Sequence, residues 1–220
     1  MSGKLIVIEG LDGSGKATQA QRLYEKLIRE NEKVIKISFP DYESDSSALV
    51  KMYLDGQFGH NPSDVNPYAA SSFYAVDRFA SYAKNWKKFY LDGGIIIADR
   101  YTTSNAIHQC AKLPDDQWND FVKWLFNYEY NLLGIPTPFS TIYLRVDPDV
   151  SQSLMSKRYN GDEDKKDIHE SNLEYLKRSR QAADYCAKTL KWNVVECVNN
   201  DKMKSIDEIA DDIYFIIKNN

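Results

Sequence analysis

The segment Glu9–Thr18, which reads EGLDGSGKAT, constrains the fold of this chain more than any other stretch. It lies between a short apolar run and an amphipathic helical pattern. Gly10, Gly13 and Gly15 allow unusual backbone dihedral angles and a close approach to a ligand. The turn then directs several backbone N–H groups inward at a helix N-terminus, which is a site for phosphate groups. Lys16 adds a positive charge that can follow the phosphates.

Apolar runs and helical patterns alternate along the rest of the chain. Runs that are apolar on both faces are typical of parallel strands covered on each side. The expected strands are Leu5–Glu9, Val34–Phe39, Ile95–Ala98, Thr141–Val146 and Asn193–Val198. The expected helices are Lys16–Arg29, Tyr68–Tyr90, Trp118–Asn131, Asp149–Arg158, Ser171–Leu190 and Ser205–Lys218. This alternation predicts an α/β fold in three layers, with a five-stranded parallel sheet flanked by helices. The length of 220 residues suits a single domain over residues 1–220.

Composition narrows the class of protein. The net charge of -4 argues against a broad nucleic-acid interface, which normally carries a basic excess. No run approaches the roughly 18 apolar residues of a membrane helix, and the N-terminus shows no signal peptide. The three cysteines are odd in number and form no CxxC pair, which favours a cytoplasmic protein with buried, unpaired thiols.

One position departs from the usual phosphate-loop pattern. The pattern places Ser or Thr directly after the lysine, as a hydroxyl that touches Mg²⁺, but this chain has Ala17. Thr18 follows, and it is turned by about 100° on a helix, so it does not replace that ligand directly. Either Mg²⁺ is held by phosphates, water and a carboxylate, or the site is weakened.

Further motifs give the chain a resemblance to a known family. They are GLDGSGKAT in the loop, Phe39-Pro40, FYAVDR at Phe73–Arg78, DRYTTS at Asp99–Ser104 and YLRVDPDVS at Tyr143–Ser151. Over nearly its whole length the chain resembles the thymidylate kinases. The resemblance implies a P-loop kinase fold, a homodimer, and transfer of the γ-phosphate of ATP to dTMP with Mg²⁺, giving dTDP for dTTP synthesis.

The resemblance also implies which residues bind the nucleotides. The triphosphate site would comprise Gly10, Asp12, Gly13, Ser14, Gly15, Lys16, Ala17 and Thr18. The monophosphate site would comprise Asp12, Phe39, Pro40, Tyr74, Arg78, Arg100, Ser104, His108 and Gln109. The catalytic groups would be Lys16, Asp99, Arg100 and Arg158.

Individual roles follow from the family. Asp12 would accept a hydrogen bond from the sugar 3′-OH, or would cap its turn. Arg78 and Arg100 would hold phosphates, because a guanidinium contacts them with two donors, although Arg78 could instead be ion-paired. Asp99 would join the metal–water shell or orient Arg100. Tyr74 would stack on the base, or would pack in the helix core.

The remaining base contacts are implied in the same way. Gln109 would contact the base edge, and His108 occupies a position where the family often has an aromatic residue. The family often has an arginine shortly after Phe39-Pro40 for the acceptor phosphate, whereas this chain has Asp41 and Tyr42.

A lid is expected at about residues 155–168. The phosphate loop carries no basic residue besides Lys16, so the resemblance places catalytic charge in the lid. Lys157, Arg158, Lys165 and Lys166 lie there, with Arg158 as the foremost candidate. The alternative for this run is a solvated charged loop.

Three other functions remain open from sequence. A deoxynucleoside kinase would need a general base for its hydroxyl acceptor, and Glu9 is the available carboxylate. The chain could also be a nucleoside monophosphate kinase with another acceptor. In particular, the sequence leaves the choice between dTMP and dUMP open. A nucleotide-binding protein with weakened catalysis would fit Ala17 and the missing arginine.

Overall fold

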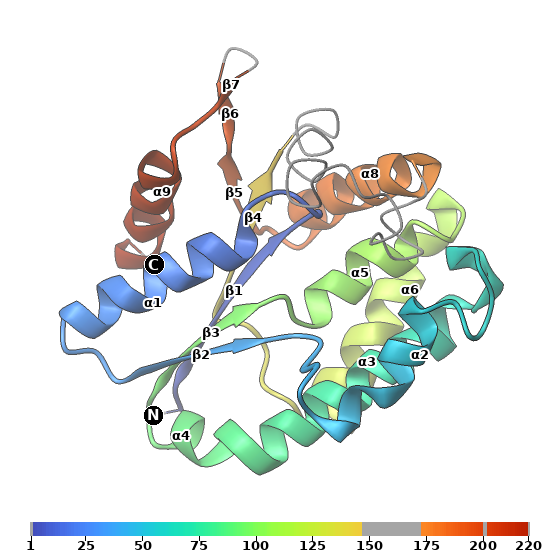
Figure 1. The fold of residues 1–220 in the computed structure, drawn as a ribbon, viewed down its shortest axis with the longest axis horizontal. Helices are drawn as coiled ribbons and strands as arrows, with labels where there is room; N and C mark the ends of the chain where they lie inside the picture. Colours follow the sequence, from blue (N-terminus) through green and yellow to red (C-terminus); the bar gives the residue numbers. More distant parts are fainter. Residues whose placement is uncertain (1, 147–172, 200–201, 220) are drawn as a thin grey trace.

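The chain folds around a central parallel sheet, seen in a computed structural model that describes residues 2–146, 173–199 and 202–219. The sheet consists of β1 (Lys4–Gly10), β2 (Val34–Ser38), β3 (Ile95–Asp99), β4 (Ser140–Arg145) and β5 (Asn193–Glu196). Their spatial order is β2-β3-β1-β4-β5, and all four pairings are parallel (Figure 1). The predicted fold class is confirmed.

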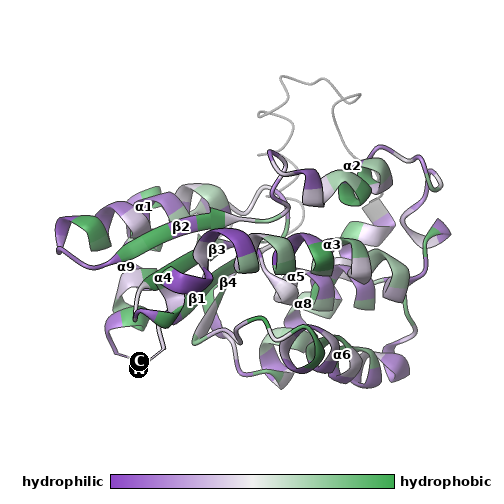
Figure 2. Ribbon diagram, turned by 90° about the horizontal axis from the view of Figure 1, so that it is seen from below, coloured by the Kyte–Doolittle hydropathy of each residue, from purple (hydrophilic) through white to green (hydrophobic). Residues whose placement is uncertain are grey.

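Helices cover both faces of the sheet. Successive side chains of β1 point to opposite faces, and since residues 5–8 are all apolar, each face must be covered. Ile6 and Ile8 pack with residues of α1 (Lys16–Arg29) and α9 (Ile206–Lys218) in one core cluster. On the other face, Leu5 and Val7 pack in a cluster that includes Tyr82 and Trp86. Figure 2 shows strands coloured largely as hydrophobic and helices in which hydrophilic and hydrophobic residues alternate.

Six further α-helices lie in the described part of the chain. They are α2 (Ala48–Leu54), α3 (Pro67–Ser81), α4 (Lys87–Leu91), α5 (Thr102–Cys110), α6 (Trp118–Phe126) and α8 (Leu173–Thr189). Among them, α4 packs Phe89 and Tyr90 on the second face of the sheet. Two long predicted helices are each interrupted. A π-helical turn at Tyr82–Trp86 separates α3 from α4, and a second π turn at Asn127–Leu132 ends the helix that starts at Trp118.

Several predicted boundaries need correction. Val198 was expected in the fifth strand, but it pairs antiparallel with Met203 in a small hairpin of β6 (Val198–Asn199) and β7 (Lys202–Met203). Helix α5 was not predicted, since all nine of its residues are buried and no amphipathic pattern marks it. The predicted helix Asp149–Arg158 and the lid at 155–168 lie outside the described residues.

The cysteines agree with the sequence-based expectation. Cys110, Cys186 and Cys197 are free and buried. Within the described residues, no helix is long and apolar enough to cross a membrane.

Candidate active site

The phosphate loop connects β1 to α1. Gly13 and Gly15 have φ of 78° and 85°, values that favour glycine. A side chain at Gly10 would come within 2.5 Å of the Ser14 hydroxyl, so the tight packing of the loop requires glycine there. Lys16 is buried and donates from Nζ to the backbone carbonyl of Leu11 at 2.8 Å. The loop therefore has the close backbone packing that the motif predicts.

Lys16 keeps its charge near neutral pH. Burial, together with the positive charge of Arg100, lowers the pKa of its amine to about 8. Asp12 acts in the opposite direction, with its Oδ1 at 3.7 Å from Nζ. A protonated amine inside the loop suits an anionic ligand.

Arg100 links this loop to the end of β3. It has φ of 67°, a left-handed conformation that is uncommon for a residue with a side chain and that turns the chain sharply out of the strand. Its guanidinium forms an ion pair with Asp12 and donates to the hydroxyl of Ser104 at 3.4 Å. Burial alone would lower its pKa, but the carboxylates of Asp12, Glu9 and Asp99 raise it, so Arg100 remains charged.

His108 contacts the same guanidinium. Its Nε2 lies 3.2 Å from Nη1 of Arg100, and since arginine only donates, Nε2 accepts. Burial and the neighbouring Arg100 lower the pKa of the imidazole to about 3. Nδ1 then carries the proton, 3.4 Å from the hydroxyl of Tyr175. His108 is thus a neutral partner that orients Arg100.

Glu9 supports the site from behind. Its side chain is 0% exposed and accepts from the hydroxyls of Ser104, at 2.7 Å, and Thr103, at 3.1 Å. Burial raises its pKa. Glu9 is not one of the residues that line the cavity described below. A base for a hydroxyl acceptor would have to reach the ligand, so this position does not support the deoxynucleoside kinase alternative.

Arg78 is held by a second buried ion pair. Nε and Nη2 donate to the two carboxylate oxygens of Glu129 at 2.7 and 2.6 Å. Thr102 donates to Glu129 as well, at 2.8 Å. Arg78 is 1% exposed and also lines the cavity. It is therefore ion-paired with Glu129 and at the same time positioned beside a ligand in the cavity.

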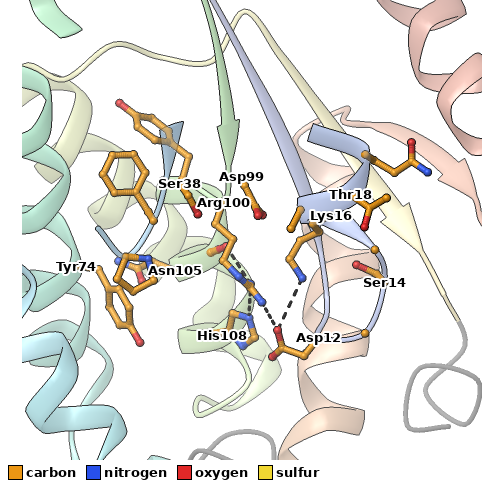
Figure 3. Close-up of a pocket in the computed structure, with 18 of the residues that line it drawn as sticks. Asp12, Ser14, Lys16, Thr18, Ser38, Tyr74, Asp99, Arg100, Asn105 and His108 are labelled. Atoms are coloured by element: carbon orange, nitrogen blue, oxygen red, sulfur yellow. Dashed lines mark hydrogen bonds and ion pairs between the residues drawn. The ribbon is translucent and has the colours of Figure 1, made fainter. Parts of the chain in front are cut away.

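One cavity of about 820 Å³ gathers most of the predicted site (Figure 3). The predicted residues that line it are Asp12, Gly13, Ser14, Gly15, Lys16, Ala17, Thr18, Phe39, Pro40, Tyr74, Arg78, Asp99, Arg100, Ser104, His108 and Gln109. Gly10 is the last residue of β1 and is not one of the residues that line the cavity. Arg158 lies outside the described residues.

The cavity has two chemically different ends. At one end the phosphate loop meets residues near the C-terminus. Tyr74 lies at the other end (Figure 3). Gln109 also lines the cavity, and both of its amide atoms are buried with no hydrogen-bond partner among the described residues. Because buried polar groups are normally paired, this amide is suited to the polar edge of a ligand.

The sequence did not point to every lining residue. The structure adds Gln19, Ser38, Leu54, Tyr101, Asn105, Met203, Lys204, Ile206 and Ile209, and it brings Tyr42 to the wall. Asn105 lies one position after the DRYTTS motif and four residues before Gln109, a spacing that could have suggested it. The C-terminal residues carried no motif.

Asp99 is the residue best suited to a metal. Its Oδ1 is buried and has no hydrogen-bond partner among the described residues, while Asp99 lines the cavity with Lys16 and Arg100. Across the described part of the chain, no group of three His, Cys, Asp or Glu side chains could hold a metal. A lone carboxylate fits Mg²⁺, which usually takes one or two carboxylates and completes its shell with water and phosphates.

This fold and site define an ATP-dependent phosphotransferase of the P-loop class. Residues 8–213 match the family described as Thymidylate kinase. The chain belongs to the thymidylate kinase family.

Individual thymidylate kinases are similar in sequence to this chain over most of its length. The thymidylate kinase of Mycobacterium tuberculosis is 28% identical, with 80% of this chain and 81% of the relative covered. That of Schizosaccharomyces pombe is 26% identical, with 99% and 92% covered. A solved thymidylate kinase from Candida albicans superposes with a TM-score of 0.72 at 24% identity, covering 100% of this chain and 92% of that chain, which supports the fold.

The neutral state of His108 predicts a pH-dependent stability. The unfolded chain protonates this side chain below about pH 6.5, whereas the folded chain does so only near 3. Between these values the unfolded state binds more protons, so this contribution to stability falls as pH falls from 6.5 towards 3. We expect the His108→Asn variant to lose about 1.4 kcal/mol less per pH unit in that window than the wild type.

Urea unfolding at pH 7, 6 and 5 measures this difference. His60→Asn, at an exposed histidine, is the matched control. Equal pH slopes for the wild type and His108→Asn would contradict a neutral buried imidazole.

Proposed function

We propose that this protein transfers the γ-phosphate of ATP to dTMP. The observation that carries the proposal is a single cavity that joins the phosphate loop to the Tyr74 and Gln109 wall, with the Asp12–Arg100 ion pair between them. Donor and acceptor must meet in line, and a shared cavity brings their phosphates together. Relatives named thymidylate kinase over 80% or more of the chain support dTMP as the acceptor.

Different residues would bind the donor and the acceptor at the two ends of the cavity. The loop amides and Lys16 hold the donor phosphates. Arg100 neutralises the phosphates where transfer occurs, and Tyr74 and Gln109 contact the acceptor base. The acceptor phosphate is already ionised, so no strong general base is needed. Lid closure, with Arg158 adding charge near the transferred group, would exclude water.

Asp99 would hold Mg²⁺ through water or directly, with the nucleotide phosphates supplying the other ligands. Bound there, Mg²⁺ neutralises the charge on the phosphoryl oxygens. Ala17 contributes no hydroxyl, so the metal depends on Asp99 more than in loops with Ser or Thr after the lysine. We also propose that the protein works in the cytoplasm.

An acceptor panel tests the function. With ATP and Mg²⁺, turnover is expected to be fastest with dTMP, slower with dUMP and absent with thymidine, in an assay that couples ADP release to NADH oxidation. Excess EDTA should stop turnover, and added Mg²⁺ should restore it. ATP binding without turnover on any acceptor would instead support a protein with weakened catalysis. Turnover on thymidine but not dTMP would support a deoxynucleoside kinase.

Variants test the roles of the charged residues. Lys16→Ala and Arg100→Ala are expected to reduce kcat at least about 100-fold, because each removes charge that stabilises the transition state. Arg158→Ala is expected to lower kcat more than it raises KM. Lys36→Ala, on an exposed part of β2, is the control. Full activity in all three variants would refute the assignments.

We further propose that the chain forms a homodimer through α3. Val76 and Phe79 are exposed on one face of this helix, and Tyr68, on the same face, contacts Trp124 of α6. Exposed apolar residues grouped in this way mark association surfaces.

Light scattering tests the dimer. The wild type is expected at twice the chain mass, and Phe79→Glu at the monomer mass, since a charge would be buried at the interface. Phe215→Glu on α9, also at an exposed phenylalanine, should leave the dimer intact. A monomeric wild type, or a dimeric Phe79→Glu, would rule out this interface.

A further inference from the structure

The segment after β2 reaches the cavity and is held there by α3. It follows the cis Phe39–Pro40 peptide, and Phe39, Pro40 and Tyr42 line the cavity. Beyond Tyr42 the chain enters a 3₁₀ turn at Asp45–Ser47. The side chain of Tyr42 is half exposed.

One carboxylate of α3, that of Asp77, accepts two hydrogen bonds from this segment, and Lys51 of α2 donates a further one to the carbonyl of Tyr42 at 3.1 Å. The backbone N–H of Asp41 donates to Oδ2 of Asp77 at 2.9 Å. The hydroxyl of Ser46 donates to Oδ1 of Asp77 at 2.6 Å. Asp77 therefore binds the two ends of the stretch that contains Tyr42.

Asp77 is an unusual choice for this position in a helix. It is 1% exposed, and burial raises its pKa. Alanine would favour the helix more and would avoid the cost of burying a carboxylate. Its two bonds to the segment offset that cost, since hydrogen bonds to a charged group contribute more than neutral ones.

The neighbouring residue makes the opposite connection. Arg78 forms its ion pair with Glu129, a residue of the second π turn. Tyr74 lies one helical turn before Arg78 and lines the cavity. The adjacent pair Asp77–Arg78 thus ties α3 to both flanking segments. Any shift of the segment after β2 moves Pro40 and Tyr42 relative to Tyr74 and Arg78.

We propose that Asp77 is a positioning residue for the acceptor nucleotide. It holds the Pro40–Tyr42 wall in register with Tyr74 and Arg78, so that the acceptor end of the cavity is formed before the ligand binds. The inference rests on the proposed function for the identity of the acceptor. It does not require Asp77 to touch either nucleotide.

Steady-state kinetics of three variants test the inference. Asp77→Ala removes both hydrogen bonds, and the KM for dTMP is expected to rise about 10- to 100-fold, the range for losing one or two bonds to a charged group. The KM for ATP should stay within about twofold, because the two hydrogen bonds of this carboxylate go to the segment after β2 and not to the phosphate loop. Asp77→Asn retains a carbonyl for Asp41 and an amide for Ser46, so it should recover most of the affinity. Ser46→Ala, which removes one bond, should be intermediate.

Hydrogen exchange gives a readout that needs no substrate. The Asp41 amide is expected to exchange faster in Asp77→Ala than in the wild type, and to regain protection in Asp77→Asn. Asp45→Ala, at an exposed carboxylate in the same turn, is the matched control for both measurements. Thermal unfolding of each variant confirms that the fold is intact.

The outcomes separate the two proposals. A wild type that does not phosphorylate dTMP would overturn the proposed function, and the exchange result would still decide whether Asp77 fixes the segment. An unchanged KM for dTMP in an active Asp77→Ala would overturn the positioning role alone. Equal rises in both KM values, or failure of Asp77→Asn to recover, would also overturn it.

Discussion

The ion pair between Arg100 and Asp12 is the interaction on which the site depends. It joins the end of β3 to the phosphate loop after β1, two neighbouring strands of the sheet. The left-handed backbone at Arg100 aims the guanidinium across this gap, and Ser104 and His108 hold it from α5. Because the pair is largely shielded from water, its orientation is fixed more firmly than that of a surface ion pair.

Buried acidic residues extend this arrangement outward. Glu9 binds the hydroxyls of α5, Glu129 binds Arg78, and Asp77 binds the segment after β2. Each carboxylate lies where two chain segments meet, and each is compensated by hydrogen bonds or an ion pair. Removing one partner would leave a buried charged or polar group unpaired, which is costly. The cavity walls are therefore specified by polar contacts as well as by apolar packing.

The strands and the first site motifs were predictable because their signals are local. Each of the five apolar runs overlaps one of the five strands of the sheet, and the phosphate loop lies between β1 and α1 as its motif predicts. Helix α5 was not predicted, because all of its residues are buried and its sequence therefore has no amphipathic pattern. Val198 was misplaced because a strand and a short hairpin arm have the same local composition. The lining residues Met203, Lys204 and Ile206 carried no motif, and only the packing of the C-terminal segment brings them to the loop.

By itself, the sequence determined a parallel α/β sheet, a phosphate loop with Lys16 and Ala17, and membership of a nucleotide-binding class. Those features depend on periodicity and on residues adjacent in the chain. The tertiary structure decided which distant side chains meet: Arg100 with Asp12, Arg78 with Glu129, and Asp77 with Asp41 and Ser46. These partners lie 31 to 88 residues apart in the chain. They meet because of the order of the strands in the sheet and the packing of the helices on it, and no local sequence pattern encodes such a pairing.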